Sequence, residues 1–371
     1  MTIQGTTPDQ PSPTLAEQVV EEKRTPFAIL AGLRELVLLP VIVLLIVFGS
    51  FMHPAFLTWN NITSNVMGGV AVLAIMVVAE ALLIIAGKFD LSIQSTVALA
   101  PMLAAYLIVP AAVGGSGAEL HPLLGIAVLF GVGLAVGVFN GFLVAKLNLN
   151  AFIVTLAMLI LLQGLTLGVS GGRTISNLPD AFTFIGLTSF LGIRLEVWIA
   201  LAVIGGAAYV MRFTVVGRHI YAIGGNVEAA RAAGVRVERV IFGLFVLASL
   251  LASLAGLVLT SRIASVSIGQ GSNLIFTVFA AAVIGGIDLN GGRGRIIGAA
   301  TGVLLLAIIQ NLLVLLEVPP FWVTAIYGAV ILVSMMIGAI TSSFGGLLLL
   351  ISPSGTHQPA DAKLGGTISA P

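Results

Sequence analysis

A succession of long apolar stretches constrains this chain more than any other feature. Residues 66–87 read VMGGVAVLAIMVVAEALLIIAG, with Glu80 as the one charged residue. A bilayer core of about 30 Å needs roughly 20 apolar residues in a helix. Hydrophobic residues make up 58% of the chain. Charged residues make up 8%, whereas soluble domains contain roughly 25% charged residues. The sequence therefore predicts an all-α integral membrane protein.

The same criterion of about 20 apolar residues predicts about ten transmembrane helices. The expected spans are residues 36–52, 66–87, 92–111, 122–145, 151–169, 196–212, 240–261, 274–286, 296–316 and 321–351. The eighth is too short to cross alone, and the last is long enough to cross and continue along the surface.

Orientation follows from Lys and Arg, which concentrate in cytoplasmic loops. With both termini in the cytoplasm, only Arg173, Arg194 and Arg262 of the 16 Lys and Arg residues fall outside. We expect a transmembrane domain at 35–351 with a large cytoplasmic loop at 213–239. The flanking residues 1–34 and 352–371 are polar, and we expect a disordered cytoplasmic leader and tail. The outer loop at 170–195 is expected to fold back partly onto the protein.

Several function classes are disfavoured. The chain has no cysteine and four scattered histidines, which argues against disulfides, thiolate catalysis and a metal site. A net charge of +1 does not create the positive electrostatic field that attracts nucleic acid, so nucleic-acid binding is disfavoured. No nucleophile, base and metal converge, so we predict no catalytic residues and no enzyme activity.

The cytoplasmic loop holds a short polar segment, GGNVEAARAAG, at residues 224–234. Two glycines would free the chain to turn, and Asn226 is a good N-cap. Glu228 suits the first turn of a helix, and Gly234 suits the left-handed residue that ends one. The pattern predicts a helix of about two turns at 226–233.

Such a short helix is marginal alone in water. One interpretation is a surface helix that only returns the chain to the membrane. The other is a docking element for a cytoplasmic partner, with small alanine faces and directional charges. Its candidate residues are Gly224, Gly225, Asn226, Glu228, Ala229, Ala230, Arg231 and Gly234.

The segment GRHIYAIGGNVEAARAAGVRVERV, followed by an apolar helix, resembles the cytoplasmic coupling segment of ribose-type permeases of bacterial ABC importers. Three further stretches resemble the same family and follow in the same order along the chain. They are GKFDLSIQSTVALAPMLAA (87–105), NAFIVTLAMLILLQGLTLGVSGGRTISNLPDAF (150–182) and FAAAVIGGIDLNGGRGRIIGAATGVLLLAIIQNLL (279–313). The resemblance covers nearly everything between the two tails.

This resemblance implies that the chain is one subunit of a transport complex in a bacterial inner membrane. Two permease chains, expected to be identical, form the channel, two cytoplasmic ATPase subunits drive it, and a periplasmic solute-binding protein delivers the solute. The 226–233 helix would then couple the ATPase to the membrane helices. ATP and Mg²⁺ would sit on the partner, since the only Gly-Lys pair here, Gly87 and Lys88, has Leu82 where a P-loop needs its first glycine.

The resemblance departs from the family at GKFDLS, where the family usually reads GGIDLS. Lys88 and Phe89 replace a glycine and an aliphatic residue of the family sequence. Asp288 and Asn290 also depart from the usual pattern. These departures put the substrate in doubt rather than the class.

Polar residues inside or near the spans are candidates for the substrate path. A carboxylate at the depth of Glu80 costs several kcal/mol unless it faces water, a partner or the bundle interior. Asp90 is expected to cap the next helix beside Ser92. Interhelical packing explains isolated polar residues equally well. The candidates are Glu80, Asp90, Asn65, Asn140, Gln163, Gln310 and Asn311.

Three functions remain open. The first is the permease subunit of an importer for a monosaccharide or related polyol. The second is the same class with a nucleoside, an amino acid or a signalling sugar derivative as cargo. The third is an ion-coupled secondary transporter, which Glu80 and the short eighth span would suit.

Overall fold

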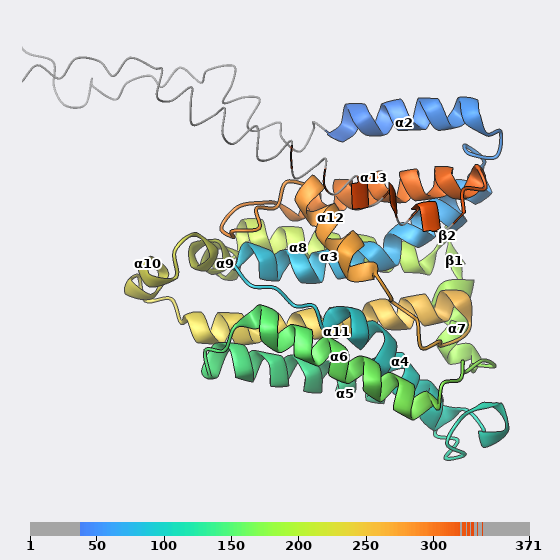
Figure 1. Cartoon of the computed structure of the whole chain (residues 1–371), viewed down its shortest axis with the longest axis horizontal. Coiled ribbons are helices and arrows are strands. Elements are labelled where there is room, and N and C mark those ends of the chain that lie inside the picture. Colours follow the sequence, from blue (N-terminus) through green and yellow to red (C-terminus); the bar gives the residue numbers. More distant parts are fainter. Residues whose placement is uncertain are drawn as a thin grey trace, which may run out of the picture.

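The computed structural model describes residues 38–319, 321–323, 325–326, 328–329, 332 and 336. Within them the chain forms a bundle of helices that run along one long axis, with one small hairpin at an end (Figure 1). The helices are α2 (Leu38–Met52), α3 (Met67–Ile85), α4 (Ile93–Ile108), α5 (Pro122–Gly141), α6 (Ala151–Ser170), α7 (Asp180–Leu187), α8 (Leu195–Phe213), α9 (Val215–Gly225), α10 (Val227–Ala232), α11 (Val237–Ile263), α12 (Leu274–Ile284) and α13 (Ile296–Leu315).

Three short helical turns and a hairpin complete the described part. Two π-helical turns, η1 (Asn61–Val66) and η3 (Phe142–Lys146), adjoin α3 and α5, and a 3-10 turn, η2 (Ala111–Val113), follows α4. Strands β1 (Ser189–Phe190) and β2 (Ile193–Arg194) pair antiparallel.

The first nine expected spans each correspond to a helix in the described residues. Six helical segments there are long and apolar enough to cross a membrane, namely Asn61–Ile85, Pro122–Lys146, Ala151–Ser170, Leu195–Phe213, Val237–Ile263 and Ile296–Leu315. Helices α2, α4 and α12 are apolar but shorter. The tenth expected span, 321–351, lies largely outside the described residues, as do the leader and the tail, so the count of ten stays a prediction.

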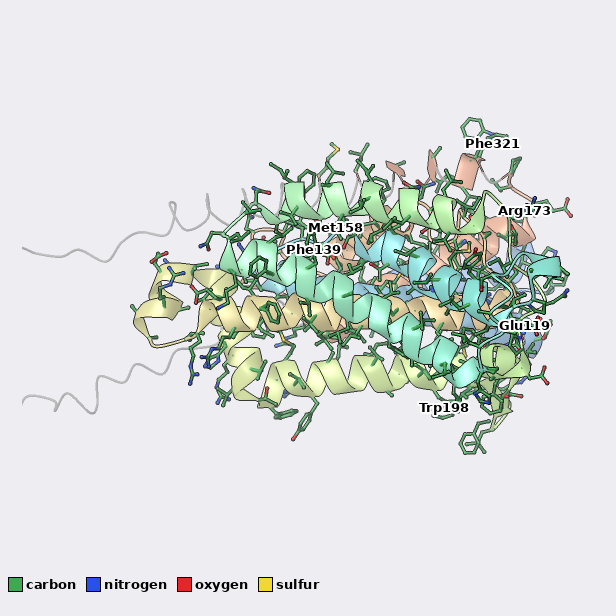
Figure 2. The ribbon with its side chains drawn as sticks, turned by 90° about the horizontal axis from the view of Figure 1, so that it is seen from below. Glu119, Phe139, Met158, Arg173, Trp198 and Phe321 are labelled. Carbon is green, nitrogen blue, oxygen red and sulfur yellow. The ribbon has the colours of Figure 1, made fainter. Side chains whose placement is uncertain are left out.

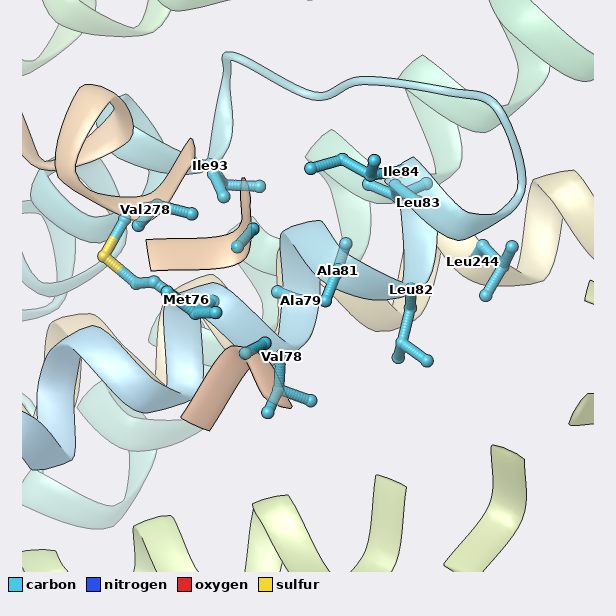
Figure 3. Packing of buried hydrophobic residues seen from close by; sticks show 14 of the residues in the cluster. Met76, Val78, Ala79, Ala81, Leu82, Leu83, Ile84, Ile93, Leu244 and Val278 are labelled. Carbon is cyan, nitrogen blue, oxygen red and sulfur yellow. The ribbon is translucent and has the colours of Figure 1, made fainter. Parts of the chain in front are cut away.

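Helix α3 is the centre of the bundle. Every residue from 71 to 86 is buried, because a helix that is apolar all round is stable only inside a protein or a membrane. It packs against α8, α11, α12 and α13. Figure 3 shows this cluster, in which Met76 of α3 lies near Val278 of α12.

The outer helices expose apolar side chains, such as Leu44 on α2, Ile160 on α6 and Tyr209 on α8. An exposed apolar surface of this extent is typical of contact with lipid or with another subunit. The described part therefore has the surface of a multi-pass membrane protein.

The outer segment 170–195 folds back onto the bundle as expected. Phe182 of α7 is fully buried, and Ile175 forms a β-bridge with Val266. The hairpin between α7 and α8 is a local exception to the all-α prediction. It lies at the end of the molecule opposite α10 (Figure 1).

The three arginines predicted to lie outside share that end. Arg173 is at the extremity away from α10 (Figure 2), and Arg194 belongs to β2. Arg262, at the end of α11, donates to the Ser64 carbonyl oxygen at 3.4 Å. These three arginines thus lie at one end of the bundle, and the side of a membrane that this end faces stays a prediction.

Candidate coupling helix and intramembrane polar clusters

Helix α10 begins and ends where the sequence pattern predicts. The Asn226 side-chain oxygen accepts from the Ala229 amide at 3.0 Å, which is an N-cap. Gly234 adopts a left-handed φ of 82°, and the Val235 amide donates to the Ala230 carbonyl at 3.0 Å. The helix projects from one end of the bundle together with α9 (Figure 1).

The surface of α10 is exposed except at Ala230, which is buried, and Val227, which is half-buried and packs against the core. Arg231 donates to Glu228 at 2.9 Å and to Glu238 of α11 at 3.0 Å. The carboxylates of Glu238 and Glu228 raise the pKa of Arg231 above its usual value. The two charges proposed to face a partner therefore pair with each other in the free chain, and Ala229 lies exposed beside them.

The two glycines before Asn226 do not act as the free turn that the sequence suggested. Gly224 and Gly225 end helix α9 and have no left-handed φ. A β-carbon at Gly224 would overlap the carbonyl oxygen of Ile85 and the amide nitrogen of Gly292. Gly224 is required because backbone meets backbone there, whereas Gly225 has open space around it.

We call this contact the glycine junction: Gly87 after α3, Gly224 of α9, and Gly291 and Gly292 before α13. The Gly292 amide donates to the Ile85 carbonyl at 2.8 Å. Tyr221 of α9 also donates to the Gly294 carbonyl oxygen at 2.8 Å. The segment that carries α10 thereby contacts the end of the central helix α3 and the loop before α13.

The first polar cluster forms where the chain leaves α3. Residues 86–92 fold back along α3, so the Asp90 amide donates to Glu80 Oε1 at 3.2 Å. Asp90 Oδ1 accepts from the Ser92 amide at 2.9 Å and from its hydroxyl at 2.5 Å. Asn140 of α5 donates to the Ser92 hydroxyl at 2.8 Å.

All four residues of this cluster are buried. Asp90 precedes α4 but is not its cap as expected, because Ser92 is the N-cap residue and makes no side-chain cap hydrogen bond, while Asp90 accepts from Ser92. Glu80 faces the bundle interior. Glu80 Oε2, Asp90 Oδ2 and Asn140 Oδ1 have no hydrogen-bond partner within the described residues. Three of the candidate path residues are thus brought together.

A second cluster joins η1 to α13. Asn61 and Asn311 exchange reciprocal amide hydrogen bonds at 2.8 and 2.9 Å, and Asn65 donates to Asn61 at 2.9 Å. Asn61 is the centre of this cluster, and the sequence interpretation missed it because it precedes the expected span. Gln163 and Gln310 are exposed on α6 and α13 and join neither cluster.

Sequence reasoning also missed Glu196 and Gln270. Glu196 begins α8, is fully buried, and lies 4.0 Å from the Arg194 guanidinium. Gln270 donates to Thr260 at 2.8 Å and ties the loop after α11 to that helix. Glu196 looks like an ordinary first-turn acid in sequence, so no local signal marks it.

Comparison with known proteins gives a consistent picture. A family model described as branched-chain amino acid transport system / permease component matches residues 62–350. The chain is 35% identical over 311 residues to the ribose import permease protein RbsC of Escherichia coli K12, covering 83% of this chain and 94% of that protein.

Two other relatives are named for different transported solutes. The L-arabinose ABC transporter permease protein AraH of Azospirillum brasilense is 35% identical, covering 80% of this chain and 85% of that protein. The autoinducer 2 import system permease protein LsrC of Escherichia coli K12 DH10B is 33% identical, covering 81% and 85%. No solved structure matches the chain.

Proposed function

Because the chain belongs to the branched-chain amino acid transport system permease family, we propose that it is the transmembrane permease subunit of an ATP-driven importer. Its relatives are permeases of ribose, arabinose and autoinducer 2 systems. It is a transport subunit rather than an enzyme.

The energy source is proposed to be a separate cytoplasmic ATPase subunit that binds ATP and Mg²⁺. The chain has no P-loop sequence of its own. The arabinose relative is named as the permease of an ABC transporter, which favours ATP over the ion-coupled alternative that Glu80 had suggested. The buried position of Glu80 against Asp90 is explained by the fold of residues 86–92.

The observation that carries the coupling proposal is the exposed, capped α10 beside the glycine junction. We propose that α10 docks in a cleft of the ATPase. Closure of the ATPase pair would push α10, and the backbone contacts at Gly224 would pass that movement to α3 and α13.

The proposed cargo is a monosaccharide or related polyol, by likeness to the ribose and arabinose permeases. The buried amides of Asn61 and Asn311 and the exposed amide of Asn65 supply neutral donors and acceptors of the kind that a polyol path needs. An amino acid, as in the family description, or a signalling derivative, as in the autoinducer 2 system, is the alternative cargo.

The proposed setting is the bacterial inner membrane, with both termini cytoplasmic. We propose that lipid and a second identical permease chain cover the exposed apolar faces of α2, α6 and α8. A periplasmic solute-binding protein would deliver solute to the end opposite α10. We expect no nucleic-acid partner, since the net charge is only +1.

Uptake into proteoliposomes tests this function. We expect radiolabelled ribose or arabinose to accumulate only when the chain is reconstituted with its ATPase, a solute-binding protein and ATP. An ATPase whose nucleotide-binding lysine is replaced is the control. Uptake by the chain alone, driven by a proton or sodium gradient, would refute the proposal.

A further inference from the structure

A pocket of about 350 Å³ lies at the end of the molecule opposite α10, between the start of η1 and the segment 186–194. Small-molecule sites span roughly 300–1,000 Å³, so this volume suits one sugar ring rather than an oligosaccharide. Neither polar cluster described above lines it.

The η1 side of the pocket carries neutral hydrogen-bonding groups. The Ser64 hydroxyl donates to the Asn60 side-chain oxygen at 3.2 Å, and the Thr63 hydroxyl donates to the Trp59 carbonyl at 2.8 Å. Within the described residues these bonds leave the Asn60 NH₂ group and the lone pairs of both hydroxyls for a ligand.

An aromatic ring and a cation stand on the other sides. Trp59 is 66% exposed, and a β-carbon at Gly192 would lie 3.8 Å from its ring, so the hairpin turn abuts the indole. Arg194 donates to the Gly186 carbonyl at 3.4 Å, and its guanidinium has further N–H donors.

The floor of the pocket is fixed. The Gly186 amide donates to the Ser261 hydroxyl at 2.6 Å, and a β-carbon at Gly186 would lie 2.5 Å from the Ser261 carbonyl oxygen. Behind Arg194, the buried carboxylate of Glu196 lies between the guanidinium groups of Arg194 and Arg262 and offsets part of their charge. Most polar groups that line the pocket, those of Asn60, Thr63, Ser64 and Ser189, are neutral, which suits a ligand with several hydroxyl groups.

We propose that this pocket is an acceptor site for a single monosaccharide or similar polyol, where solute first contacts the permease. An indole face packs against the C–H face of a sugar ring, while amide, hydroxyl and guanidinium groups bind its hydroxyls. The inference rests on the proposed function, since only a sugar importer would present a polyol there.

Direct binding to the purified permease–ATPase complex, without the solute-binding protein, tests the site. We expect D-ribose or L-arabinose at millimolar concentration to give a saturation-transfer NMR signal, and L-leucine to give none. Trp59→Leu should weaken sugar binding about three- to tenfold, the usual effect of an aromatic contact. Phe184→Leu replaces another exposed aromatic residue, on α7 and outside the pocket, and should change nothing.

Ser189→Phe is a second variant, which should fill the pocket and abolish the signal without disturbing the buried floor. Unchanged sugar binding in both variants, or no sugar signal in a complex that still imports sugar with ATP, would overturn the acceptor site. The second result would fit Trp59 as a membrane-interface anchor. Loss of ATP-dependent uptake in the unmodified complex would instead refute the proposed function.

Discussion

Gly224 is the residue at which α9 touches α3 through backbone atoms alone. Gly224→Ala should displace α9 from Ile85 and Gly292, because neither backbone group can yield cheaply. We expect a loss of about 1–3 kcal/mol of stability, as in other overpacked sites, and a larger loss of uptake. Thermal unfolding and proteoliposome uptake measure the two effects.

Gly225→Ala is the matched control, because the neighbouring position has open space and a helical backbone. It should be neutral or slightly stabilising, since alanine restricts the unfolded chain. Equal effects of the two substitutions would show that the glycine junction is not a close backbone contact.

The reciprocal amides of Asn61 and Asn311 give a second prediction. Asn311→Leu alone removes two of the hydrogen bonds of the buried Asn61 amide, which keeps its bonds to the Phe56 carbonyl and to Asn65, and should cost about 1–3 kcal/mol. Replacing both Asn61 and Asn311 with leucine should cost less than the sum of the two single changes, because the hydrogen bonds that the two amides share are lost only once. A double-mutant cycle on thermal unfolding measures this, and simple additivity would contradict it.

The sequence located some residues of the candidate sites and missed others for identifiable reasons. Asn226 and Gly234 were predictable, because caps act through local backbone geometry. The role of Gly224 was not, since its constraint comes from Ile85, far away in the chain. Asn61 owes its importance to Asn311 of α13, and Glu196 to its burial beside Arg194 and Arg262 of α11.

Among the elements, α10 is the one whose surface defines the proposed coupling. We expect the double change Glu228→Arg with Arg231→Glu to keep the pair within α10 while reversing the charges a partner meets. The permease should stay folded, because the ion pair is exposed and contributes little. Co-purification of the ATPase and ATP-driven uptake should both fall.

A useful control is Glu238→Gln, which removes the other carboxylate at Arg231 but leaves the outer charges of α10 in place. It should retain ATPase binding. If the double variant binds its ATPase and transports normally, α10 is a simple surface connection.

The pattern of elements was largely predictable where apolar runs are long. Spans such as 151–169 and 296–316 agree with α6 and α13 within a residue or two. Helix α9 was missed, because eleven amphipathic residues within a charged loop give a weak signal. The hairpin at 189–194 depends on packing beside Trp59 and η1, which the sequence does not reveal.

At the scale of the whole molecule, the bundle has two unlike ends joined by α3. One end presents α10, and the other presents the hairpin, Arg173 and the outer pocket (Figures 1 and 2). Because α3 is buried along its length and bonded to the glycine junction, a push at α10 acts on the centre of the bundle rather than on its edge.

Site-directed thiol labelling tests this arrangement most directly, since the chain has no cysteine of its own. We expect the Ala229→Cys variant to react with a membrane-impermeant maleimide only from the cytoplasmic side, and to be protected when the ATPase is bound. The Ser189→Cys variant should react only from the opposite side. Labelling of the position 229 thiol from outside, or no protection by the ATPase, would contradict the proposed coupling.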